Sequence, residues 1–139
     1  MSEKFEKKHY SYSEWARPMF SEAVTLTGPG KLIFLAGIGA EDENGAPGVI
    51  RHLGDVTGQS RYAFDKAKRI LARHGATMND VVKIVAYLTD VRDRAQYSKC
   101  REEALAGGEA LPAHTFLTVS NLAWPGMLME IDITAAVAS

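Results

Sequence analysis

Two apolar, β-branched segments lie near the N-terminus and are separated by turn-forming residues. Ser21–Thr27 and Lys31–Gly37 have the length and composition of strands, and Gly28-Pro29-Gly30 between them contains the residue types that favour tight turns. This pattern predicts a β-hairpin. The second segment is the more apolar of the two, so we expect it to be central in a sheet.

The next segment has the hydrophobic period of a helix. Between residues 55 and 74, apolar side chains recur at steps of three and four residues, whereas charged side chains fall mainly between them. Asp55 can accept hydrogen bonds from the free N–H groups of a first helical turn, and Gly75 can adopt the left-handed conformation that ends a helix. The pattern predicts an amphipathic helix over Asp55–His74.

The C-terminal half alternates further strands with one more helix. Val81–Thr89 is rich in Val and Ile at strand length, and Asp90 or Asp93 can cap a second helix that ends at Gly107-Gly108. Two last strands are expected at Ala113–Val119 and Met127–Val137. In the last of them, Met127, Met129, Ile131 and Ile133 share one face, and Leu128, Glu130, Asp132 and Thr134 share the other.

The predicted order is therefore ββαβαββ, an α+β fold in which both helices cover one face of a mixed sheet. Residues 1–12 are expected to form a flexible N-terminal arm, and residues 13–139 a single domain. Two helices cannot cover both faces of such a sheet. Because an uncovered apolar face favours association, we expect a closed homo-oligomer.

Charge and composition limit the partners, the cellular location and the cofactors that we expect. The 139 residues carry 16 Lys and Arg and 17 Asp and Glu, a net charge of −1, so we do not expect nucleic acid as a partner. No apolar run is long enough to span a bilayer, and the charged N-terminus is unlike a signal peptide, so we expect no membrane partner and a cytoplasmic location. Cys100 is the only cysteine, and the four histidines lack ligand spacing, so no metal site or cofactor is expected.

Five short motifs carry a resemblance to a known family. They are Phe20-Ser21-Glu22-Ala23-Val24, Ala36-Gly37, Asp80-Val81-Val82-Lys83-Ile84, Leu111-Pro112-Ala113-His114-Thr115 and Glu130-Ile131-Asp132. In this combination and order, the chain resembles the RidA/YjgF family over roughly residues 18 to 137. The family is also called the endoribonuclease L-PSP family. The resemblance implies a chorismate-mutase-like fold, a homotrimer, and small-molecule clefts between neighbouring subunits.

The resemblance also implies a chemistry, since several family members hydrolyse reactive enamines and imines to ketones and ammonia. Glu130 matches the family carboxylate that positions the attacking water. In the deaminating members an Arg clamps the substrate carboxylate at the position where this chain has His114, and a Tyr usually stands where it has Phe20. An imidazole lacks the forked donors of a guanidinium, so the resemblance implies a divergent member that lacks the catalytic Arg.

We therefore expect Glu130 and His114 to be catalytic, with Glu130 acting on water and His114 on the charge that develops at nitrogen or oxygen. The substrate-binding candidates are Phe20, Gly37, Ala113, Trp124, Arg17 and Arg51. Arg17 and Arg51 are included because either could supply the missing positive charge.

Structural alternatives remain open for each of these residues. His114 could be a hydrogen-bonded histidine at a subunit interface, and Glu130 could pair with a Lys or Arg across the sheet. Trp124 could anchor its loop on the core rather than line a cleft, and Cys100 is better explained by helix packing than as a nucleophile. The favoured function is hydrolysis of a small imine, enamine or related carbonyl compound. The alternative is a trimer that binds a small molecule without catalysis.

Overall fold

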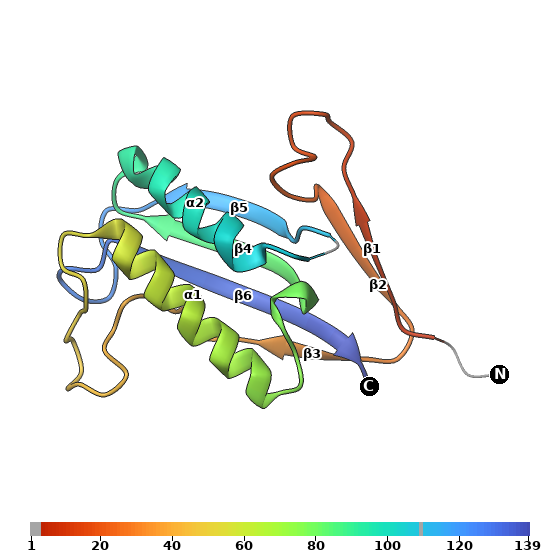
Figure 1. Ribbon diagram of the computed structural model, residues 1–139, viewed down its shortest axis with the longest axis horizontal. Helices are drawn as coiled ribbons and strands as arrows, with labels where there is room; N and C mark the ends of the chain where they lie inside the picture. The colour runs from red at the N-terminus through yellow and green to blue at the C-terminus, as the bar shows by residue number, and fades with distance from the viewer. Residues whose placement is uncertain (1–3, 109) are drawn as a thin grey trace.

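A four-stranded mixed sheet forms the centre of the computed structural model, which describes residues 4–108 and 110–139 (Figure 1). Its strands, in spatial order, are β3 (Gly30–Phe34), β6 (Met129–Ala138), β4 (Val81–Leu88) and β5 (Ala113–Thr118). β6 is antiparallel to both of its neighbours, and β4 and β5 are parallel. The predicted strands over 81–89, 113–119 and 127–137 are confirmed to within two residues.

Two helices cover one face of this sheet, α1 (Val56–Arg73) and α2 (Arg94–Leu105) (Figure 1). Asp55 caps α1 as expected, since its Oδ1 accepts from the Gly58 N–H at 3.0 Å. The helix ends before Gly75, whose φ is +78°. Asp90 instead caps the short 3₁₀ turn Val91–Asp93, through the Arg92 N–H at 2.9 Å, and α2 begins one residue later. A second 3₁₀ turn, Met78–Asp80, precedes β4.

The core lies between the helices and the inner face of the sheet. Alternate residues of β4 and β6 are buried, and Ile84, Met129 and Ile131 are fully enclosed beneath Leu71 of α1 and Tyr97 of α2. Burying each of these aliphatic side chains stabilises the fold by about 1.5–3 kcal/mol. The predicted division of the last strand into an apolar and a polar face is therefore confirmed.

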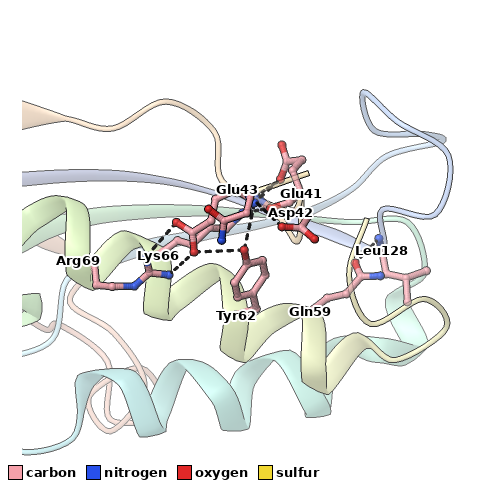
Figure 2. A network of polar contacts seen from close by, with 10 residues as sticks. Glu41, Asp42, Glu43, Gln59, Tyr62, Lys66, Arg69 and Leu128 are labelled. Carbon is pink, nitrogen blue, oxygen red and sulfur yellow. Dashed lines mark hydrogen bonds and ion pairs between the residues drawn. The ribbon is translucent and has the colours of Figure 1, made fainter. Parts of the chain in front are cut away.

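Gln59 of α1 ties the helix to the loop that leads into β6. Its Nε2 donates to the carbonyls of Gly126 at 2.9 Å and His52 at 3.2 Å. Its Oε1 accepts from the Leu128 N–H at 2.9 Å (Figure 2). All of its polar atoms thus have partners although the side chain is buried, as a stable core requires. These bonds fix the start of β6, and with it the position of Glu130.

The N-terminal segment differs from prediction. Residues Glu6–Tyr10 form strand β1, which pairs antiparallel with β2 (Ala23–Thr27) in a separate two-stranded sheet. The expectation of a flexible arm over residues 1–12 is wrong for this strand, and residues 1–3 lie outside the described residues. The predicted hairpin between Ser21–Thr27 and Lys31–Gly37 is also wrong, because β2 pairs with β1 whereas β3 pairs with β6.

The bend at Gly28 explains this change of partner. Its φ is +84°, and a Cβ there would overlap the backbone carbonyl of Lys4, so the chain before β1 crosses directly over the bend. The Gly-Pro-Gly segment therefore redirects the chain from one sheet to the other instead of folding β3 back onto β2.

Buried polar contacts attach the β1–β2 sheet to the entry of β5. The Leu111 carbonyl accepts from Ser21 Oγ at 2.6 Å and from His9 Nδ1 at 2.7 Å, and the Ser21 N–H donates to the Pro112 carbonyl at 3.1 Å. Ser21 also forms a parallel bridge with Ala113, the first residue of β5. The N-terminal sheet thus fixes the segment that leads directly into His114.

We predict that Ser21→Ala lowers the free energy of unfolding by about 1 kcal/mol, because it removes one buried hydrogen bond. It should also speed hydrogen exchange in residues 6–10, where a flexible arm would exchange fast in both proteins. Ser120→Ala, at an exposed position, is the control. Chemical denaturation and exchange mass spectrometry at one protein concentration measure both effects, and unchanged exchange in β1 would contradict the docking described.

Candidate functional site

His114 lies on the helix-covered face of the sheet. It pairs with the buried Ile84 of β4, and its Nε2 is 3.0 Å from the hydroxyl oxygen of Tyr97 in α2. Period-two alternation along β5 places Phe116 on the same face, and its ring centroid is 6.4 Å from that of the imidazole. The imidazole is therefore held between the sheet and α2.

Both members of this pair are uncharged at neutral pH. Burial, followed by the nearby positive charges of Arg101, Lys83 and Arg94, lowers the pKa of His114 to about 3. Burial also raises the pKa of the Tyr97 hydroxyl above its ordinary value. His114 can thus donate or accept a hydrogen bond at pH 7, but it carries no proton to give as an imidazolium.

A cavity of about 220 Å³ opens beside His114. Its residues come from the turn before β2, from α2 and from β5: Trp15, Met19, Phe20, Arg94, Ser98, Arg101, Glu102, His114 and Phe116. The ring of Phe20 meets that of Trp15 edge to face, with centroids 5.5 Å apart. Phe20 and His114 therefore line one pocket, whose walls combine aromatic rings with charged side chains.

The sequence interpretation did not identify Arg101, the most buried charged residue of this pocket. It is 6% exposed, and its guanidinium carbon lies 5.9 Å from the centroid of the Tyr97 ring. Arg94 lies two turns earlier in α2, over the Phe116 ring at 5.7 Å. The signal that could have revealed Arg101 is its spacing of four residues from Tyr97, which places it on the buried side of α2.

Glu130 lies on the opposite face of the sheet. It pairs with Tyr87 of β4, whose hydroxyl donates to Asp132 Oδ2 at 3.1 Å. Burial, followed by the negative charges of Asp132 and Glu41, raises the pKa of the Glu130 carboxyl above its ordinary value. A Cβ at Gly37 would lie 2.6 Å from Glu130 Oε2, so only glycine leaves room for this carboxylate.

The structure thus brings together some predicted site residues and separates others. Phe20, Ala113 and His114 lie at or beside the cavity under α2, whereas Gly37 and Glu130 lie together on the other side of the sheet. Within one chain, the two predicted catalytic side chains do not face each other.

The remaining predicted binding residues lie elsewhere. The Arg17 guanidinium donates to the Ser11 carbonyl at 3.3 Å. The Arg51 guanidinium carbon is 4.6 Å from the centroid of the Tyr62 ring. Trp124 packs on Gly48, where a Cβ would lie 3.0 Å from the indole. Trp124 therefore anchors its loop, and none of these three side chains lines the cavity beside His114.

A second cavity, of about 460 Å³, extends from Gly37 to the outer side of α1. Arg69 donates two hydrogen bonds to Glu43, at 2.7 and 2.9 Å, and the buried Lys66 donates to the Glu41 carbonyl at 2.6 Å (Figure 2). Burial lowers the pKa of Lys66. Because these cations already have protein acceptors, we interpret the network as structural support for the loop after β3.

Cys100 of α2 packs against α1. Burial raises the pKa of the Cys100 thiol, whose Sγ contacts the Thr57 carbonyl at 3.6 Å, as expected for a helix-packing cysteine. Over residues 4–108 and 110–139, no three His, Cys, Asp or Glu side chains gather as a metal ion would need. In that same part of the chain, no helix combines the length and apolar character needed to cross a bilayer.

Known proteins are similar to this chain in both sequence and architecture. The model of the endoribonuclease L-PSP family matches residues 13–137. A RutC family protein of Pyrococcus abyssi is 33% identical over 117 residues, which cover 84% of each chain. A conserved Rid family protein, YyfB of Yersinia pestis, superposes with a TM-score of 0.79 at 25% identity, covering 94% of this chain and 98% of the other.

A third relative is Rv2704 of Mycobacterium tuberculosis, a member of the YjgF/YER057c/UK114 family. It is 27% identical, with a TM-score of 0.63, and the match covers 95% of this chain and all of the other. The family match spans the cavity beside His114 as well as the Glu130 carboxylate. The chain belongs to the endoribonuclease L-PSP family, also known as the RidA/YjgF family.

Proposed function

We propose that the protein is a homotrimeric hydrolase that converts a small imine, enamine or related carbonyl compound in clefts between its subunits. The observation that carries the proposal is the Glu130 carboxylate, which has a raised pKa, stands open beside Gly37 and forms no ion pair with a described cation. Such a carboxylate is suited to accept a proton from water.

The face that carries Glu130 supports assembly. Three apolar side chains on this face are exposed: Phe34 by 72%, Leu32 by 52% and Leu117 by 44%. An apolar sheet face of this kind is the surface that a second copy of the chain would cover. Because His114 and Glu130 lie on opposite faces, a neighbouring subunit is also what would bring a His114 pocket next to a Glu130 carboxylate.

The chemistry then needs only water. Glu130 removes a proton from a water molecule as the water oxygen bonds to the C=N carbon, and the Glu130 carboxyl then passes this proton to the nitrogen. The resulting carbinolamine collapses: its C–N bond breaks and its hydroxyl proton is transferred to the departing nitrogen, so that one imine and one water give one carbonyl compound and one ammonia. His114, being neutral, contributes a hydrogen bond to the nitrogen or oxygen on which charge develops.

Phe34→Glu should reduce the oligomer to smaller species at micromolar concentration, because it would bury a charge in the subunit interface. The control is Val91→Glu, at an apolar position that is 61% exposed in the 3₁₀ turn before α2. Sedimentation velocity on all three proteins measures the effect. A wild-type protein that is a folded monomer at this concentration would overturn the proposal.

Glu130→Gln should lower the rate of ammonia release from a panel of small imines by about 10²- to 10⁴-fold, the usual contribution of a positioned base. Glu103→Gln is the control, since Glu103 pairs with Arg61 on the surface at 3.1 Å. Wild-type protein that binds these compounds tightly without turnover would instead identify a non-catalytic binding trimer.

The pH profile separates the two catalytic candidates. The base form of Glu130 is present only above its raised pKa, so kcat/KM should increase with pH through a midpoint above 4.5. His114→Asn should retain this acid limb, because the pKa of His114, about 3, lies below it. A limb near pH 6.5 that disappears in His114→Asn would contradict the neutral role assigned to the imidazole.

A further inference from the structure

The cavity under α2 contains the buried guanidinium of Arg101, which forms no ion pair with any described carboxylate. Arg61, Arg69 and Arg92 each pair with a carboxylate, at 2.7–3.1 Å. In the part of the chain that the structure describes, no carboxylate lies within ion-pair distance of Arg101 or Arg94, although Arg101 is only 6% exposed. A buried charge without a counter-charge is unfavourable, and an anion in the adjoining cavity would relieve it.

Contacts with Tyr97 leave most donors of this guanidinium available. The Tyr97 ring lies 5.9 Å from the Arg101 guanidinium carbon, and Arg101 also donates a hydrogen bond to the Tyr97 hydroxyl, which engages only part of its set of N–H donors. Since the Arg101 side chain lines the cavity, its donors can be reached by a ligand there. A forked donor matches the two oxygens of a carboxylate.

The charges around the cavity limit the ligand further. Arg94 and Arg101 contribute two positive charges, Glu102 contributes one negative charge, and His114 is neutral, which leaves an excess of one positive charge. This balance fits a monoanion better than a dianion such as a phosphate monoester. The remaining walls include the rings of Trp15, Phe20 and Phe116, which suit a flat or apolar body.

We propose that Arg101 binds the carboxylate of a small monocarboxylate with an apolar body, and that Arg94 assists at the same cavity. The guanidinium that position 114 lacks is thus supplied from helix α2, rather than by Arg17 or Arg51. Use of this carboxylate pocket in catalysis rests on the proposed hydrolase function, whereas its binding does not.

The test measures binding of benzoate and of its uncharged analogue benzamide to the full chain by titration calorimetry. Wild-type protein should bind benzoate at least tenfold more tightly than benzamide. Arg101→Gln should weaken benzoate binding by about 10- to 100-fold, the range expected for hydrogen bonds between charged groups, and leave benzamide binding nearly unchanged. Arg92→Gln, which removes the same charge from a surface pair with Asp90, should bind benzoate as wild type does.

Two further variants keep the result decisive. Arg94→Gln alters an exposed residue of the same cavity and should weaken benzoate binding several-fold even if the Arg101 variant fails to fold. Glu130→Gln should bind benzoate normally, so a loss of turnover there with intact binding separates the two proposals. Equal affinity of wild type for benzoate and benzamide, unchanged benzoate binding in Arg101→Gln or Arg94→Gln, or tighter binding of inorganic phosphate than of benzoate would overturn the inference.

Discussion

The alternation of side chains along β5 and β6 is the constraint on which the site depends. Successive residues of a strand point to opposite faces, and the pairing of β4 with both strands fixes which face each residue takes. His114 therefore shares the helix side with Ile84, and Glu130 shares the open side with Tyr87. A shift of one residue in either register would exchange the buried and open sets, and the enclosed Ile131 would then be exposed.

Elements with a strong period could be predicted from the sequence. Helix α1 combines an apolar stripe with Asp55 and Gly75 at its ends, and β6 separates carboxylates from apolar residues in strict alternation. The same reasoning places Glu130 correctly on the polar face, because local period alone decides it. It also gives the order of the elements from β2 to β6.

What sequence pattern could not provide is pairing between distant segments. Strand β1 is short and charged, and its contacts are with distant segments: it pairs with β2, and His9 contacts the Leu111 carbonyl, 102 residues away. The Gly-Pro-Gly segment led to the incorrect prediction of a hairpin. Turn-forming residues indicate that the chain changes direction, but they do not indicate which strand the next segment pairs with. Arg101 was missed for a similar reason: it lies in a helix of mostly polar residues, and its burial depends on β5 and on the turn before β2.

The two groups of cations in the structure differ in their ion pairing. Around Arg69 and Lys66, protein oxygens accept from both cations, and the result is a fixed loop after β3. Around Arg101, the contacts are the ring and the hydroxyl of Tyr97, and no carboxylate of the described residues pairs with the guanidinium. The low pKa of His114 follows from the same arrangement, since burial and the positive charges of Arg101 and Arg94 both oppose its protonation. Neutral His114 and charged Arg101 are therefore one electrostatic unit, in which the helix supplies the charge and the strand supplies a hydrogen-bonding ring.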